Sequence, residues 1–213
     1  MALGTNSKKY RQEQTIMKEN LINSGIINSK ELSREELKPQ VVKYLGIEPN
    51  RLEKLKLWKN KILVSISGVG GRFLSYRCFG VWYKAIRIAI ENCQNREQLL
   101  YIGNLINKEV ERFGHHYDDV ALEELRQVWW EKAQYIKAEE KRLKAIRERK
   151  QAGQRWQDGW VQVLINCDSF QALQSLAREI ERQSRKFEDL PEISQGMARI
   201  WQQRWQELSM SSA

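Results

Sequence analysis

The sequence predicts a mainly α-helical fold that carries one small three-stranded antiparallel sheet. Only three of its 213 residues are proline, and long runs of Glu, Lys, Arg, Gln, Leu and Ala favour helix. One stretch differs, because "KNKILVSISGVGGRFLSYRCF", from Lys59 to Phe79, alternates apolar and polar residues around three glycines. Further along, two segments resemble each other at helical spacing, which predicts two similar three-helix units joined by a long charged helix.

The N-terminal segment, residues 1–50, is expected to be helical. "SREE", from Ser33 to Glu36, has the pattern of a capping box. "QVVKYLGIEPNRLEKL" also fits a helix-turn-helix, with an apolar helix, a glycine and a short basic segment. Pro49 and the strand pattern that follows leave little room for a recognition helix, so we interpret this region as a packing element.

Residues 51–80 are expected to form the sheet from "EKLKLW", "KILVSIS" and "RFLSYRCF". Lys59-Asn60 and "GVGG" are the connections, and the glycines indicate a hairpin turn with positive φ, since no Gly-Lys-Ser/Thr of a phosphate loop follows. Alternation predicts one apolar face, which the helix from about Val81 to Asn92 can cover. The opposite face is expected to display six basic residues: Lys54, Lys56, Lys59, Lys61, Arg72 and Arg77.

The order strand, strand, strand, helix resembles the small DNA-binding modules of the AP2 type and the arm-binding domains of tyrosine recombinases. The resemblance covers about Leu55 to Asn92 and concerns the topology, the basic strand face and the aromatic residue before the helix. It implies a sheet that enters the major groove of DNA, which admits a two-stranded ribbon. No recombinase catalytic part follows in the sequence.

The positive charge of the chain is concentrated in two windows. The net charge is +9, but residues 51–87 carry +8 and residues 137–155 carry +5, so the remainder is negative. A solubility device does not require such concentration, whereas a phosphate-rich partner does. The second window adds three candidate contacts, Lys141, Lys144 and Arg147, although a solvated connecting helix is an equally good interpretation of it.

The internal repeat organises the rest of the chain into a helical unit at 81–136, the charged helix at 137–155 and a second unit at 156–213. A shift of 74 residues superposes Trp82 on Trp156 and Asn92-Cys93 on Asn166-Cys167. In each unit the first helix is expected to end at the Asn-Cys pair. The N-caps of the second helices are expected at Asn95 and Ser169. In the first unit, Asp118 or Asp119 is expected to cap the third helix. We expect three aromatic residues to pack the helices together, with an exposed stacking surface as the alternative: Trp129, Trp201 and Trp205.

The sequence indicates no catalytic, cofactor or metal site. "FGHHYDD" holds the only two histidines, but without a further ligand spacing it is better explained as a loop whose aspartates cap a helix. Cys78, Cys93 and Cys167 form no CxxC pair and are expected to be reduced. The first residues lack an apolar signal core, and no run is long enough to span a membrane, so we expect a cytoplasmic protein without a membrane partner.

These observations predict a non-enzymatic nucleic-acid-binding protein, with DNA favoured over RNA. The basic sheet would contact phosphates, and the helical units would form the body and a surface for a protein partner or a homodimer. The alternative is a helical adaptor whose charge serves an acidic protein partner.

Overall fold

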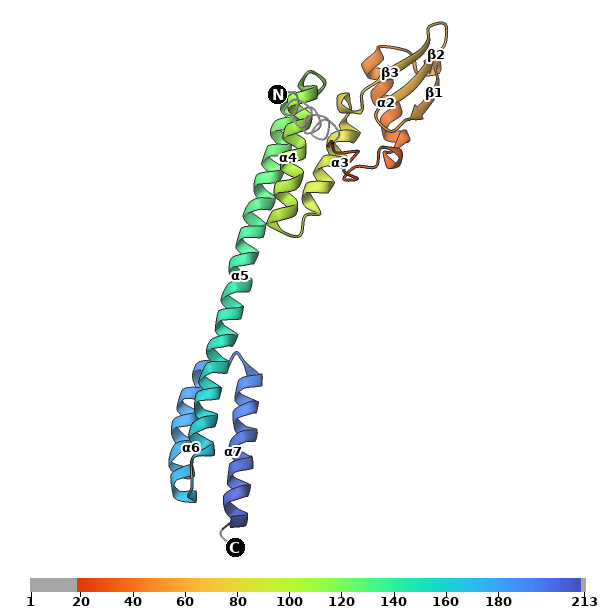
Figure 1. Cartoon of the computed structure of the whole chain (residues 1–213). Coiled ribbons are helices and arrows are strands. Elements are labelled where there is room, and N and C mark those ends of the chain that lie inside the picture. The colour runs from red at the N-terminus through yellow and green to blue at the C-terminus, as the bar shows by residue number, and fades with distance from the viewer. Residues whose placement is uncertain (1–18, 212–213) are drawn as a thin grey trace, which may run out of the picture. The chain divides into compact units, whose positions relative to one another are not determined.

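The computed structural model describes residues 19–211, which contain six α-helices and one three-stranded antiparallel sheet (Figure 1). The predicted fold class, mainly α with a small sheet, is therefore confirmed. Residues 1–18, the first part of the predicted N-terminal segment, lie outside the described residues. The helices are α2 (Arg34–Leu45), α3 (Gly80–Glu91), α4 (Arg96–Phe113), α5 (Asp119–Ile165), α6 (Phe170–Ser184) and α7 (Pro191–Ser211), and the strands are β1 (Leu52–Leu57), β2 (Ile62–Ile66) and β3 (Gly70–Leu74).

The chain divides between Ala138 and Glu139 into two compact units. Helix α5 contributes its N-terminal part to the first unit and its C-terminal part to the second, and it is continuous over the predicted charged connecting helix. Gly153 lies inside this helix. A Cβ added there would lie 2.9 Å from Leu190 Cδ1 and 3.1 Å from Ile193 Cγ1, so the absent side chain makes room for the close approach of α7.

Side-chain caps begin the helices where the sequence predicts them. The side-chain oxygens of Ser33, Asn95, Asp118 and Ser169 each accept a hydrogen bond from the backbone amide three residues further on, over 2.9 to 3.3 Å. Each cap satisfies an amide that has no partner within its own helix. The starts of α2, α4, α5 and α6 therefore have a local physical cause.

The first unit has one hydrophobic core, to which residues from Leu21 to Ile136 contribute. Its largest fully buried side chains include Trp82 on α3 and Tyr76, which precedes that helix. The predicted β element and the predicted first helical unit thus bury their apolar side chains in the same core. Removal of this much apolar surface from water is the main favourable term for the unit.

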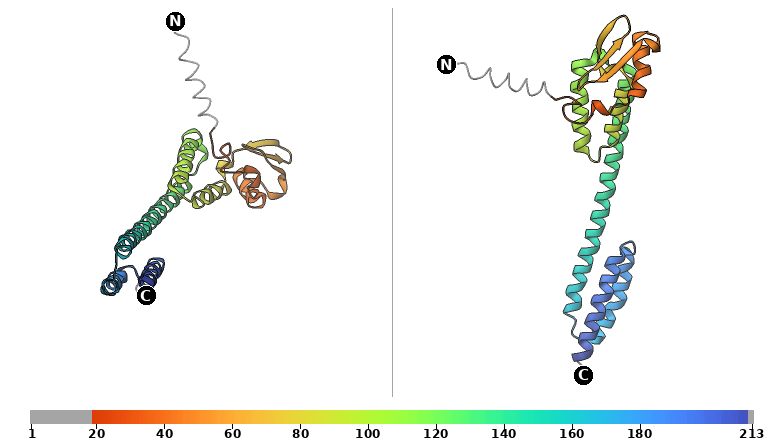
Figure 2. Two further views of the ribbon diagram at one scale, coloured as in Figure 1. Left: turned by 60° about the horizontal axis from the view of Figure 1, so that its bottom comes forward. Right: turned by 90° about the vertical axis from the view of Figure 1, so that its right-hand side faces the viewer.

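Helix α2 lies against one face of the sheet, and the opposite face is open, as two further views show (Figure 2). The sequence pattern predicted that α3 would cover this face instead. The apolar side of α3, including Trp82 and Ile86, is indeed buried, but this helix mainly contacts α2, α4 and the turn before it. A 3-10 turn, Pro49–Arg51, leads from α2 directly into β1, so no recognition helix follows α2 and a helix-turn-helix is not formed.

The third strand is shorter than predicted. It ends at Leu74, and Tyr76–Cys78 form a 3-10 turn instead of continuing the alternation. Ser75 causes the change, because its Oγ accepts a hydrogen bond from the backbone amide of Arg77 at 3.3 Å and turns the chain inwards. As a result Tyr76 and Arg77 both enter the core.

The second unit consists of the end of α5 with α6 and α7. Its core holds Leu164, Leu173 and Met197, with Trp201 and Trp205 packed against it. These two indole rings stack at 5.1 Å between centroids and are partly buried. The predicted packing role of the tryptophans is confirmed here, and also for Trp129, whose Nε1 donates to the carbonyl of Leu99 in the first unit at 3.1 Å.

Candidate nucleic-acid interface

The open face of the sheet brings together three of the predicted basic residues. Paired residues of an antiparallel sheet point to the same face. In one row across the three strands, Lys54 pairs with Ser65 and Ser65 pairs with Gly71. In the next row on the same face, Lys56 pairs with Leu63 and Leu63 pairs with Phe73. Ile62, Val64 and Ile66 alternate with these rows and are buried on the other face, so both lysines lie on the open side and are exposed. Lys61, two residues before Leu63, extends the open face beyond the second row.

A β-bulge at Glu53 makes this arrangement possible. Leu52 pairs with Ile66, but Lys54 pairs with Ser65, so the register shifts by one residue between them. Without the extra residue, Leu52 and Lys54 would point to the same face. The bulge lets Leu52 enter the core while both strand lysines stay in solvent.

The turn between β1 and β2 is held by buried groups. The hydroxyl of Tyr76 donates to the carbonyl of Trp58 at 2.6 Å, and Ser29 Oγ donates to the carbonyl of Lys59 at 2.8 Å. The backbone amide of Trp58 donates to the carbonyl of Lys61 at 2.9 Å and closes the turn. Both Tyr76 and Ser29 are almost fully buried, so the core positions this exposed basic turn.

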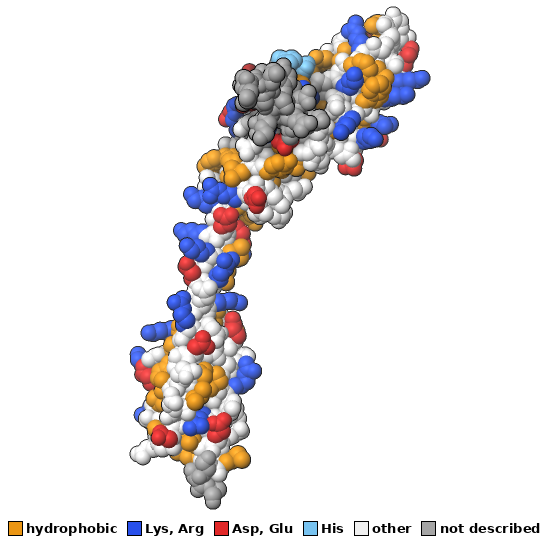
Figure 3. Space-filling view, viewed as in Figure 1, with side chains coloured by type: hydrophobic (Ala, Val, Ile, Leu, Met, Phe, Trp, Pro, Cys, Tyr) orange, Lys and Arg blue, Asp and Glu red, His pale blue; other side chains and the backbone are white. Residues whose placement is uncertain are grey.

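Two aromatic rings lie among these lysines, and the sequence analysis did not identify them as site residues. Trp58 and Phe73 are 46% and 51% exposed, and their ring centroids are 5.2 Å apart. Lys61 Nζ lies 3.8 Å from the centroid of Phe73 and 5.6 Å from that of Trp58. Figure 3 shows hydrophobic side chains over the part of the molecule that holds the sheet, with Lys and Arg side chains around them. The available signal was the two-residue step from Lys56 to Trp58, which places both on one face of a strand.

Two predicted contacts do not belong to this face. Arg72 is exposed, but it pairs with Val64 and therefore lies on the α2 side of the edge strand β3. Arg77 is only 5% exposed, so the prediction that it faces solvent is wrong. The reason is the turn at Ser75, which ends the alternation before Arg77 is reached.

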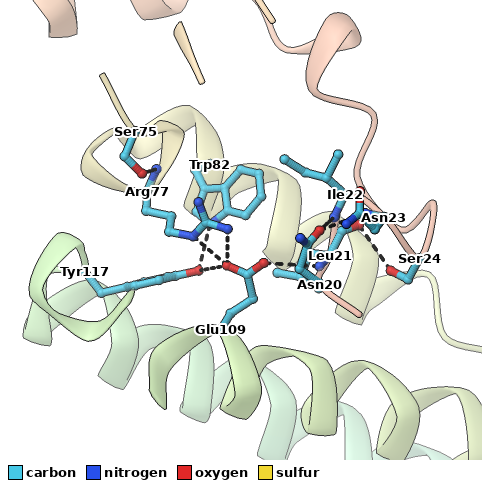
Figure 4. A network of polar contacts seen from close by, with 10 residues as sticks. All are labelled: Asn20, Leu21, Ile22, Asn23, Ser24, Ser75, Arg77, Trp82, Glu109 and Tyr117. Carbon is cyan, nitrogen blue, oxygen red and sulfur yellow. Dashed lines mark hydrogen bonds and ion pairs between the residues drawn. The ribbon is translucent and has the colours of Figure 1, made fainter. Parts of the chain in front are cut away.

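Arg77 instead forms a buried ion pair with Glu109 of α4 (Figure 4). Its Nε donates to Glu109 Oε2 at 2.5 Å, and its guanidinium lies 3.9 Å from the centroid of the Phe113 ring. Tyr117 also donates to Glu109 Oε2, and the indole of Trp82 donates to the Tyr117 hydroxyl at 3.0 Å. Burial, and next the nearby Glu109 carboxylate, raise the pKa of Tyr117 well above its usual value. This network ties the sheet to the helices and is a structural element.

The second basic window lies on an exposed stretch of α5, but much of its charge is paired. Lys144 lies 3.8 Å from Glu148, and Arg149 and Lys150 lie 2.8 and 3.7 Å from acidic residues that precede or begin α7. By contrast, within residues 19–211 no carboxylate lies at ion-pair distance from the four lysines of the sheet: Lys54, Lys56, Lys59 and Lys61. The predicted contacts Lys141 and Arg147 are exposed on the same helix. The sheet therefore presents the less compensated positive charge.

A cysteine and a histidine also meet in the first unit. Cys78 Sγ lies 3.8 Å from His116 Nδ1. Burial raises the pKa of the Cys78 thiol and lowers the pKa of His116, so both groups favour their neutral forms. A nucleophilic cysteine needs the opposite shift towards thiolate, so this contact does not favour catalysis.

Other sites and relatives provide no further assignment. In the part of the chain that the structure describes, no group of three or more His, Cys, Asp or Glu side chains is arranged to hold a metal ion. None of the helices described is both long and apolar enough to cross a membrane. No family model matches the chain, and no curated protein or solved structure matches it.

Proposed function

We propose that this chain is a non-enzymatic nucleic-acid-binding protein that contacts DNA through the open face of its sheet. The observation that carries the proposal is the group of uncompensated lysines on one exposed face, with the aromatic pair between them. Lysines that neutralise phosphates release condensed counterions, which provides most of the affinity of non-specific binding. The free thiols Cys78, Cys93 and Cys167 support a cytoplasmic location.

The proposal does not need a contribution from Arg77 or from α5. Arg77 is held by Glu109, and removing it from its partner would leave a buried carboxylate without compensation. On α5, Lys144 and Lys150 share their charge with acidic neighbours, so their attraction for phosphate is weaker. We therefore place the principal contacts on β1 and on the turn that follows it.

A titration of labelled random duplex DNA, followed by fluorescence anisotropy at about 50 mM and about 200 mM salt, tests the proposal. Lys54→Gln with Lys56→Gln should lower the affinity and reduce the slope of log K against log salt by about 0.9 per lost phosphate contact. The matched control is Lys38→Gln with Lys43→Gln, which changes the net charge equally but on exposed positions of α2. Equal losses in both variants, or no binding at the lower salt, would contradict the proposal.

The second candidate function, a helical adaptor, is supported by an apolar groove between α4 and the start of α5. The groove has a volume of about 370 Å³ and is lined by residues such as Leu100, Val110 and Trp129. A groove of this kind suits an apolar segment of a protein partner or of a second copy. If duplex DNA does not bind at low salt, this becomes the leading proposal, and capture of a partner after nuclease treatment would then be expected.

A further inference from the structure

We infer that Trp58 and Phe73 form a stacking site for unpaired bases, so that the sheet binds single-stranded nucleic acid in preference to duplex. The inference rests on the proposed function and specifies its ligand. Aromatic side chains on a basic surface bind single strands without strong sequence preference, because every base has a π-face. Such binding requires aromatic rings and basic side chains, and the two rings and the lysines lie together on the open face.

The rings of Trp58 and Phe73 are accessible to a ligand. Each of the two residues is about half exposed, although a large aromatic side chain normally gains by full burial. The planes of the two rings meet at 58°, so one flat base cannot stack on both. Each ring can receive one base of a strand whose neighbouring bases are splayed apart, as they are in unpaired segments.

Duplex DNA cannot use these rings in the same way. Within a duplex, both faces of every base are covered by neighbouring bases, and a wedge between them costs a few kcal/mol per step. The lysines can still contact duplex phosphates, because that attraction does not depend on strandedness. The geometry therefore predicts binding of both forms, with additional affinity for the single strand alone.

The site is also preorganised. The carbonyl of Trp58 accepts from the buried hydroxyl of Tyr76, and its amide closes the turn with Lys61. Phe73 lies on β3 and pairs with Leu63, so the ladder fixes its backbone. Because the turn and the strand are already ordered in the free protein, binding does not incur the entropy cost of ordering them.

Lys61 has a specific role in this arrangement. Its ammonium lies over the Phe73 ring in the free protein and shields part of it from solvent. Lys61 is exposed and has a long side chain, so a base can displace its ammonium from the ring, and the charge can then meet the phosphate of the same nucleotide. A protein partner is a poorer match for this surface, because the centres of protein interfaces are depleted in lysine.

The test compares a labelled oligothymidylate of about 15 nucleotides with a random duplex, by anisotropy on the full chain at low salt. Wild type should bind the single strand more tightly. Trp58→Leu and Phe73→Leu should each weaken single-strand binding by about 5- to 150-fold and change duplex binding by less than about twofold. Trp130→Leu is the matched control, since Trp130 is an exposed tryptophan of α5 in the first unit and should have no effect.

The outcomes separate the inference from the proposed function. Trp58→Tyr and Phe73→Tyr keep a π-face and should restore most of the single-strand affinity, which a merely structural role of the rings would not predict. Duplex binding that equals single-strand binding, with no effect of either leucine variant, would overturn the inference and leave the proposed function intact. Absence of binding to either probe would overturn both.

Discussion

The ion pair between Arg77 and Glu109 allows a stringent test of the structure, because the sequence pattern assigned Arg77 to the surface. Glu109 is 1% exposed and its carboxylate depends on Arg77 for a charged partner. The remaining donors are more distant, with the amide of Leu21 at 3.3 Å and the hydroxyl of Tyr117 at 3.4 Å. Arg77→Met therefore leaves a buried charge with weak compensation, and we expect it to lower the free energy of unfolding of the first unit by about 3–5 kcal/mol.

Removal of both charges should be less harmful than the two single losses together. In Arg77→Met with Glu109→Leu no charge is left in the core, so the double variant should be more stable than the sum of the single effects predicts by at least about 2 kcal/mol. The matched control is Arg126→Met, which breaks the ion pair with Glu123 on the surface of α5, where both side chains are mostly exposed. This control should cost less than about 1 kcal/mol.

Urea unfolding followed by circular dichroism measures these differences, and amide hydrogen exchange on α4 assigns them to the first unit. The assignment matters because two compact units need not unfold in one transition. If Arg77→Met costs less than about 1 kcal/mol and abolishes DNA binding by a folded protein, the buried position of Arg77 is refuted and the surface assignment returns.

Three further variants test other parts of the description. Burial raises the pKa of Tyr117 above 10.0, so the folded state retains a proton that the unfolded chain releases. The free energy of unfolding therefore falls as the pH rises above about 10. Tyr117→Phe should flatten this decline, measured by urea unfolding between about pH 9 and pH 11. Gly70→Ala should cost about 1–2 kcal/mol in the same assay, because Gly70 has a φ of +94° and no atom within 4 Å of an added Cβ, so backbone strain alone acts. A triple variant replaces three basic residues of α5 with Gln: Lys141, Lys144 and Arg147. It should reduce the salt slope of duplex binding less than Lys54→Gln with Lys56→Gln does. An equal or larger reduction would move the principal contact to α5.

Local chemistry explains why so much of the fold was predictable. Helix starts depend on one side chain and one amide, so Ser33, Asn95 and Ser169 could be identified from their positions alone. Hydrophobic stripes predicted the buried faces of α3 and α4 for the same reason. What could not be predicted is which element covers the sheet, because the apolar sides of α2 and α3 both fit that role and only tertiary packing decides between them.

The site was predictable to a smaller extent, since counting charges does not show what each charge meets. Arg72 and Arg77 continue the basic pattern of the strands, but register places the first on the other face and the turn at Ser75 places the second in the core. Trp58 was signalled by its two-residue step from Lys56, but a count of charges passes over an aromatic residue. Apparent strand alternation is therefore reliable only as far as the ladder extends.

Under the predicted internal repeat, Glu109 of α4 corresponds to a neutral residue of α6. The shift of 74 residues that relates Trp82 to Trp156 also relates Glu109 to Gln183. In the second unit Gln183 Oε1 accepts directly from the indole of Trp156 at 2.9 Å, whereas in the first unit Tyr117 lies between the corresponding indole and the carboxylate.

Each unit thus links a tryptophan of its first helix to a polar side chain of its second helix, directly in the second unit and through Tyr117 in the first. A neutral amide suffices in the second unit, where residues 139–211 contain no strand. The first unit can hold a carboxylate there because the turn after β3 delivers Arg77 to it. The same pair that removes Arg77 from the surface therefore fastens the turn after β3 to α4.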